Sequence, residues 1–355
     1  MIRRRAALAA AAVGAFPAAW AVGSPAAQAN GLAATPPPSA DSVFEPFEFV
    51  ALGDMPYGPD PIAGPAYREL INRVNSLAPP FTLHVGDFKS GAASCDDAEY
   101  ALQQRNFQRF AQALVYTPGD NDWLDCQRRG DDPLERLAAL RQRFFAASRS
   151  LGQRPIAVER QADAMPGFAP YVENLRWMHR GVLFATFHTV GPDNGFGAPQ
   201  ASVRAEARQR DAANAAWIAA AFALARTQAA HALVLATQAD MLISPDPERP
   251  DPGRIHPGFT RSVEHSLLPL AEAAPFPVLL IHGDSHQYIV DQPFRNTLGQ
   301  PINNLWRLEV FGHPRIHAVR VQVLAPGATG GPPFGFTRMW NPLSPDPRMP
   351  QQHPS

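Results

Sequence analysis

Lysine and cysteine are nearly absent from this chain of 355 residues. It has two cysteines and a single lysine, Lys89. Charged residues make up only 18 % of the chain and its formal net charge is −1, so no basic patch points to a nucleic-acid-binding protein. Beyond the N-terminal segment, no apolar run is long enough to span a membrane. With 45 % hydrophobic residues, the chain is long enough for a sizeable core.

The N-terminus has the features of an export signal. The letters "MIRRR" give a positive start, "AALAAAAVGAF" an apolar middle and "AQA" at 27–29 a small-residue cleavage site. We therefore expect a signal peptide over 1–29 and a flexible leader rich in Ala, Pro and Ser over 30–44. The expected location is periplasmic or secreted, with no membrane span after the signal is removed.

The two cysteines take their meaning from that compartment. In an oxidising space, an isolated pair 31 residues apart predicts a disulfide between Cys95 and Cys126. Two buried free thiols are the alternative. The bridge would join the loop after "HVGDFKSG" to the loop after "YTPGDNDW".

Short apolar runs alternate with helix-like segments along most of the chain, which predicts an α/β domain over 45–324. Strands are expected at 47–54, 81–87, 113–120, 181–191, 231–240, 276–284 and 317–324. Helices are expected at 66–77, 97–113, 134–148 and 207–228. Residues 325–355 are rich in Pro and Gly and are expected to form a surface or disordered tail.

Polar side chains follow the expected strands at the point where each one ends. They are Asp54, Asp87, Asp120, Gln238, Asp284 and His286. Parallel strands deliver their carboxyl ends to one edge of a sheet, so these groups are expected to converge. Converging carboxylates repel one another unless a cation lies among them. Each aspartate alone could instead be a helix cap or turn residue, but the set predicts a metal site that holds one or two divalent ions.

The order of these motifs resembles that of the calcineurin-like metallophosphoesterase superfamily, which includes the purple acid phosphatases. The resemblance covers residues 47–324 and is carried by "GDMPY", "HVGDFKSG", "PGDNDW", "ATQAD" and "HGDSH". It implies two packed mixed β-sheets flanked by helices, with the site at the carboxyl ends of the strands. It also implies metal-dependent hydrolysis of a phosphate ester, in which a metal-bound hydroxide attacks phosphorus.

The resemblance further implies a ligand set. One ion would contact Asp54, Asp87 and His286, and the other would contact Asp87, Asp120, Gln238 and Asp284. Histidines of the family pattern are replaced here by Pro56, Asn121, Gln238 and Asp284. The oxygen-rich set favours a hard cation such as Mn, Mg or Ca in at least the second site, and Zn or Fe stays open.

Further residues near these motifs are candidates for the chemistry. Lys89 and Asn121 are expected to stabilise charge on the transferred group, and His188 is a substitute proton donor, with His282 and His256 as alternatives. Tyr57, Ser90 and Asn194 are candidate substrate contacts. The expected substrate is a phosphorylated small molecule or a phosphodiester, and the oligomeric state is left open.

Two other functions compete with hydrolysis at a metal site. The same fold could bind a phosphorylated ligand or a metal ion without turnover, since four histidines of the pattern are replaced. The letters "GDS" at 283–285 also resemble the nucleophile block of a serine esterase family. That block comes late in this chain and no Asp-x-x-His follows it, which disfavours the esterase.

Overall fold

The computed structural model describes residues 44–243, 253–324 and 332–344. The predicted signal peptide and all but the last residue of the predicted leader lie outside the described residues. Within the described part, no helix is long and apolar enough to cross a membrane.

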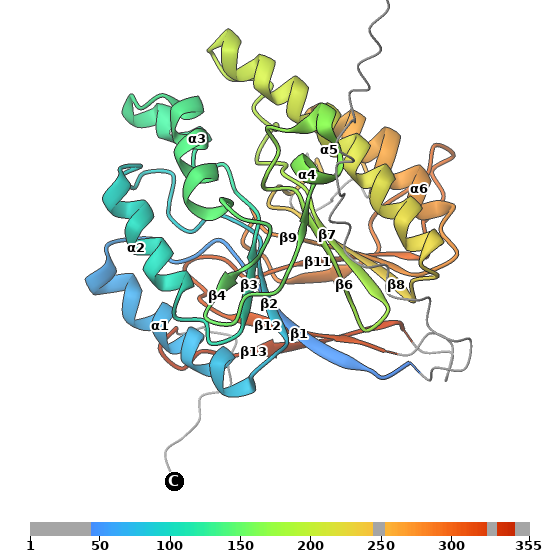
Figure 1. The fold of residues 1–355 in the computed structure, drawn as a ribbon, viewed down its shortest axis with the longest axis horizontal. Coiled ribbons are helices and arrows are strands. Elements are labelled where there is room, and N and C mark those ends of the chain that lie inside the picture. Colours follow the sequence, from blue (N-terminus) through green and yellow to red (C-terminus); the bar gives the residue numbers. More distant parts are fainter. Residues whose placement is uncertain (1–43, 244–252, 325–331, 345–355) are drawn as a thin grey trace, which may run out of the picture. The chain divides into compact units, whose positions relative to one another are not determined.

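The strands form two mixed sheets (Figure 1). The first has six strands in the order β13-β12-β1-β2-β3-β4, and β1, β2 and β3 are parallel. The second has seven in the order β10-β11-β9-β8-β7-β6-β5, and β11, β9, β8 and β7 are parallel. The strand bounds are β1 Phe47–Leu52, β2 Phe81–His84, β3 Ala113–Tyr116, β4 Leu151–Gly152, β5 Glu159–Arg160, β6 Leu175–His179, β7 Val182–Thr186, β8 Ala232–Ala236, β9 Val278–His282, β10 Ile289–Asp291, β11 Leu305–Glu309, β12 Ala318–Val323 and β13 Phe334–Met339.

Helices flank both sheets, with α1, α2 and α3 beside the first and α5 and α6 beside the second (Figure 1). Their bounds are α1 Asp60–Leu77, α2 Asp97–Phe107, α3 Pro133–Phe144, α4 Gln161–Ala164, α5 Ala201–Thr227 and α6 Leu268–Glu272. Short 3₁₀ turns are η1 Leu124–Arg129, η2 Pro166–Phe168 and η3 Pro257–Phe259, and η4 Thr260–Leu267 is a π-helix. Asp96 caps α2 by accepting from the Glu99 amide at 2.8 Å.

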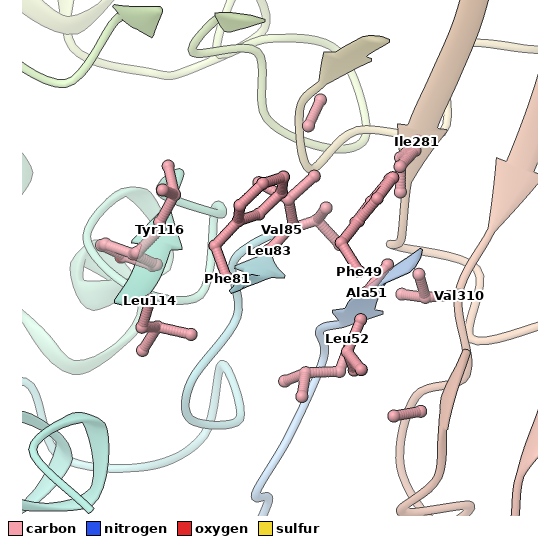
Figure 2. Close-up of a cluster of buried hydrophobic side chains, with 14 of the residues drawn as sticks. Phe49, Ala51, Leu52, Phe81, Leu83, Val85, Leu114, Tyr116, Ile281 and Val310 are labelled. Atoms are coloured by element: carbon pink, nitrogen blue, oxygen red, sulfur yellow. The ribbon is translucent and has the colours of Figure 1, made fainter. Parts of the chain in front are cut away.

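The two sheets pack against each other through aromatic side chains. The ring of Phe184 from β7 lies edge-on to Phe49 of β1 at 5.3 Å and to Phe81 of β2 at 4.9 Å. Figure 2 shows Phe49 beside Ile281 of the second sheet. Aromatic pairs of this kind are each worth about 0.5–1.5 kcal/mol beyond their buried area. The packed sheets hold the ends of β1, β2, β8 and β9 in fixed relative positions.

The central strands β7, β8 and β9 of the second sheet are buried on both faces. Their side chains point alternately to the two faces, and each face packs against a hydrophobic cluster. Along β8, Val234 faces the other sheet, whereas Leu233 and Leu235 face the outer cluster beneath α5. Trp217 and Phe222 of α5 fill that outer cluster. Burial on both faces explains why β7, β8 and β9 have continuous apolar sequences.

The architecture confirms the predicted fold class, two packed mixed sheets flanked by helices, and each strand expected from the sequence is present. The predicted disulfide is also present, with a Cα–Cα distance of 5.8 Å between Cys95 and Cys126. The prediction that regular structure ends at residue 324 is wrong. β13 pairs with β12 from Phe334 to Met339 and covers the edge of β12.

Candidate functional site

The predicted ligands converge where strands of both sheets end. The Asp54 amide donates to the Gly86 carbonyl at 2.9 Å, which joins the loops after β1 and β2. Gly283 and Gly119 allow the close approach, since a Cβ atom at either would lie 2.0 Å from an oxygen of Asp54 or Asp87, respectively. The backbone is left-handed at Asp54, Asp87, Asp284 and His286. Such strain is commonly found at functional sites.

Asp87 is the centre of the cluster. Its Oδ2 accepts from the Asn121 amide at 2.7 Å, from the Tyr57 hydroxyl at 2.9 Å and from the Gln238 amide at 3.3 Å. Its Oδ1 accepts from the Asn121 backbone at 3.1 Å. Three neutral side chains thus hold one buried carboxylate.

Gln238 also donates to Asp120 Oδ1 at 3.1 Å, while its Oε1 accepts from the Gly191 amide at 2.9 Å. These partners fix the orientation of the amide, because its oxygen must face an N–H and its nitrogen must face the carboxylates. In this orientation Gln238 is a donor to the cluster. To bind a metal ion as predicted, the Gln238 amide group would have to rotate so that its oxygen faces the cluster.

Asp54 is fully buried and only half satisfied. Its Oδ1 accepts from the Asp284 backbone at 3.1 Å and lies 3.9 Å from His286 Nε2. Its Oδ2 has no hydrogen-bond partner among the described residues. A buried carboxylate oxygen without a partner is costly, so this atom is suited to a cation.

The cluster contains the carboxylates of Asp54, Asp87, Asp120 and Asp284, and the charge of buried Lys89 acts on Asp87 without a direct ion pair. Among the described residues, no lysine or arginine forms an ion pair with any of them. Burial raises the pKa of Asp54, Asp87 and Asp120 well above the ordinary value, and their mutual repulsion raises it further. Burial raises the pKa of Asp284 to about 6.

His286 has the form of a metal-binding histidine. Its Nδ1 lies 2.8 Å from the His313 carbonyl, which can only accept, so Nδ1 carries the proton. Burial lowers the pKa of His286, which favours the neutral ring. Its Nε2 therefore offers a lone pair toward the Tyr57 hydroxyl, 3.3 Å away. Burial and the Asp87 charge raise the pKa of Tyr57, so that hydroxyl keeps its proton.

A second layer fixes the Asp87 loop. Asp122 accepts from the backbone amides of Asp87, Phe88 and Gly119 at 2.8–3.0 Å. Lys89 is buried, and its Nζ contacts the Ser90 carbonyl at 3.4 Å. Burial lowers the pKa of Lys89, and the charge of Asp122 opposes this shift. These surroundings indicate that Lys89 stabilises the Asp87 loop, and its predicted role toward a substrate stays a prediction.

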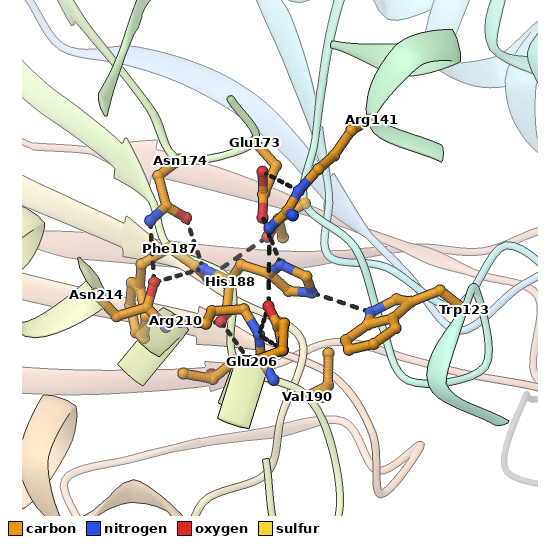
Figure 3. Close-up of polar contacts among 12 residues, drawn as sticks. Trp123, Arg141, Glu173, Asn174, Phe187, His188, Val190, Glu206, Arg210 and Asn214 are labelled. Carbon is orange, nitrogen blue, oxygen red and sulfur yellow. Dashed lines mark hydrogen bonds and ion pairs between the residues drawn. The ribbon is translucent and has the colours of Figure 1, made fainter. Parts of the chain in front are cut away.

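His188 lies in a separate buried network (Figure 3), which Arg210 extends to buried Asn194. His188 Nδ1 lies 2.8 Å from Glu173 Oε1, and its Nε2 accepts from the Trp123 indole at 3.1 Å. Both ring nitrogens are therefore engaged within the protein. Asn194 donates to the Gly258 carbonyl at 3.2 Å and accepts from Arg210. The geometry favours a structural role for both residues, and their predicted roles toward substrate stay predictions.

Of the residues predicted to contact the substrate or stabilise its charge, Tyr57 and Asn121 contact the cluster, whereas Ser90 does not. The side chain of Ser90 forms no hydrogen bond with the cluster among the described residues. Sequence reasoning missed Glu309, which lies on β11 opposite His282 of β9 and is fully buried. Burial and the Asp240 charge raise the pKa of Glu309 to about 9. No sequence signal identifies it, because β11 itself was not expected.

The fit of these residues to a metal ion is mixed. Over residues 44–243, 253–324 and 332–344, no group of three or more His, Cys, Asp or Glu side chains is arranged to hold an ion. The donor types still suit a hard divalent cation, and Asp54 Oδ2 is a free buried ligand atom. The Tyr57 hydroxyl and the Gln238 amide lie between the other donors. The residues present can therefore hold a cation only after these two side chains move.

Comparison with known proteins gives matches among solved structures alone. No protein-family model and no curated protein matches the chain. A dimetal phosphatase from Danio rerio is similar over 83 % of this chain and 99 % of its own, with 8 % identity and a TM-score of 0.45. GAP50 of Plasmodium, described as the anchor in the inner membrane complex, is similar over 83 % and 89 %, with 10 % identity and a TM-score of 0.45. A purple acid phosphatase from yellow lupin (Lupinus luteus) seeds is similar over 79 % and 50 %, with 13 % identity and a TM-score of 0.44. Two of these three are described as phosphatases.

Proposed function

We propose that the carboxylate cluster binds a divalent cation and that the protein hydrolyses a phosphate ester there. The observation that carries this proposal is the fully buried Asp54 Oδ2, which among the described residues has no hydrogen-bond partner and lies among carboxylates that form no ion pair with a lysine or arginine. A divalent cation would remove the repulsion among these groups and satisfy that oxygen. The motif order supports phosphate esters as the substrate class.

We assign metal-binding and charge-stabilising roles to particular residues of the chain. Asp54, Asp87 and His286 would hold one ion, and Asp87, Asp120 and Asp284 a second. A bound divalent cation neutralises phosphate charge and lowers the pKa of water. Asn121 is half-buried, and its amide donates to Asp87 and Tyr57, so it could donate to a non-bridging phosphate oxygen once Tyr57 moves. His286 stays oriented by the His313 carbonyl.

The test is hydrolysis of p-nitrophenyl phosphate and bis-p-nitrophenyl phosphate by the purified protein. The protein is first stripped with a chelator, and Mn²⁺, Mg²⁺, Ca²⁺, Fe²⁺ or Zn²⁺ is then restored one at a time. We expect one cation to restore turnover and Asp87→Asn to reduce it at least ~100-fold, since the shared ligand is lost. The matched control is Asp163→Asn, which changes a carboxylate bound to Arg160 and Ser148 and should keep full activity.

A second candidate function is binding without turnover. It is favoured by the three neutral donors on Asp87, which hold the site together without a cation. Cation binding without hydrolysis of either ester would support this candidate. Hydrolysis that persists after chelation and in Asp87→Asn would contradict both functions.

A further inference from the structure

The hydroxyl of Tyr57 lies between Asp87 and His286, two of the predicted ligands of the first ion. It is 2.9 Å from Asp87 Oδ2 and 3.3 Å from His286 Nε2, and it accepts from the Asn121 amide at 2.8 Å. An ion shared by Asp87 and His286 would have to lie about 2.0–2.6 Å from each donor atom. The hydroxyl fills that space.

The amide nitrogen of Gln238 has the same relation to the second site. It lies 3.3 Å from Asp87 Oδ2 and 3.1 Å from Asp120 Oδ1. Its oxygen is held on the opposite side by the Gly191 amide, so the N–H groups are directed at the carboxylates. An ion that bridges Asp87 and Asp120 must displace this amide.

We infer that Tyr57 and Gln238 compete with the cation for Asp87, so that the protein has two alternative ways to hold its buried carboxylates. In one, neutral hydroxyl and amide groups donate to them. In the other, a divalent cation takes the place of those donors and the two side chains turn away. This inference rests on the proposed function, because it assumes that a cation enters the cluster.

Competition has a consequence that a merely structural role lacks. A group that binds Asp87 only in the cation-free state stabilises that state and weakens cation binding by the same factor. Hydrogen bonds to charged groups are strong enough for that factor to reach about tenfold. Tyr57→Phe removes the hydroxyl, with its contacts to Asp87, His286 and Asn121, and keeps the ring that stacks on His313.

The experiment measures binding of Mn²⁺ and Mg²⁺ to chelator-treated protein by titration calorimetry, together with melting temperatures with and without the cation. For Tyr57→Phe we expect ~10-fold tighter binding and a melting temperature ~2–6 °C lower without cation. At saturating cation its melting temperature should equal that of the natural chain. The control is Tyr67→Phe, which removes a buried hydroxyl that has no hydrogen-bond partner among the described residues and should change neither quantity.

Gln238→Glu provides a second variant with nearly the same shape. It replaces the donor N–H groups with a carboxylate oxygen, so we expect tighter cation binding and a less stable cation-free state. Unchanged or weaker binding by Tyr57→Phe, while the natural chain binds, would overturn the inference and leave the proposed function standing. Binding by Tyr57→Phe but not by the natural chain would support the inference and contradict the proposed function. No binding by any form would overturn both.

Discussion

At the scale of single residues, the surroundings of Asp87 show how this site differs from a metal site with mainly histidine ligands. Where the family pattern has histidines, this chain has groups that donate to carboxylates, namely the Asn121 and Gln238 amides. The sequence was sufficient to predict that six strand-end residues converge. It could not predict the orientation of Gln238 or the position of Tyr57, because both depend on partners at least 30 positions away in the chain.

Lys89 and His188 illustrate the same limit. Each stands beside a motif residue, and position in the chain alone suggested a role toward substrate. In the structure, the Lys89 ammonium contacts the Ser90 carbonyl, and both ring nitrogens of His188 have hydrogen-bond partners within the protein. Such roles are decided by burial and by long-range packing, which spacing in a sequence does not reveal.

Glu309 gives a prediction at this scale, because it is buried with one oxygen unpartnered among the described residues. Burial raises its pKa to about 9, so the folded protein keeps a proton there that the unfolded chain releases above its ordinary pKa. The folded state then binds more protons than the unfolded state, and the stability from Glu309 is lost as pH rises toward 9. Glu309→Gln mimics the protonated form and should escape this loss.

The measurement compares the melting temperatures of Glu309→Gln and the natural chain between pH 4 and pH 9, in chelator. We expect equal values at pH 4 and an advantage for Glu309→Gln on the order of 5 °C by pH 8. The difference between the two proteins cancels the opposite effect of buried His84 and His188, whose pKa values burial lowers. A difference that is independent of pH would contradict the assignment.

At the scale of elements, the disulfide joins two loops that carry the site. Cys95 lies in the loop that begins at Asp87, and Cys126 lies in the 3₁₀ turn that follows Asp120. Replacing both cysteines by alanine should lower the free energy of unfolding by about 3–4 kcal/mol, since the bridge closes a loop of 31 residues. Urea unfolding measures the loss. The reduced natural chain should match the double variant, and a match between the oxidised natural chain and the double variant would refute the prediction.

The strands differed in how well sequence predicted them. β7, β8 and β9 are buried on both faces and have long apolar runs, so they were predicted readily. β6 and β11 carry exposed or charged positions such as Met178 and Arg307, and their short mixed sequences gave no clear period. Both strands lie one place in from the sheet edges, next to the short strands β10 and β5, and fewer of their side chains are apolar than in β7, β8 and β9.

At the scale of the whole molecule, the C-terminal strand decides where the domain ends. Composition placed the end at residue 324, because the prolines and glycines that follow resemble a tail. In the structure, β13 covers β12, and Asn341 beyond it donates to the Ala66 carbonyl of α1 at 2.7 Å. The Trp340 ring lies 4.9 Å from that of His317. The segment therefore ties the first sheet to a helix residue that lies 275 positions earlier in the chain.

A chain that ends at residue 324 should consequently fail to fold as the full chain does. It would expose the edge of β12, where six backbone pairs with β13 are lost along with the buried side chains of Phe334 and Met339. We expect aggregation or a melting temperature at least ~10 °C lower, since several kcal/mol of burial are removed. The control is a chain that ends at residue 344, which keeps every one of these contacts and should melt with the full chain. Equal melting of the 324-residue chain would show that β13 is not part of the domain, and cation binding by that chain would show that the site forms without it.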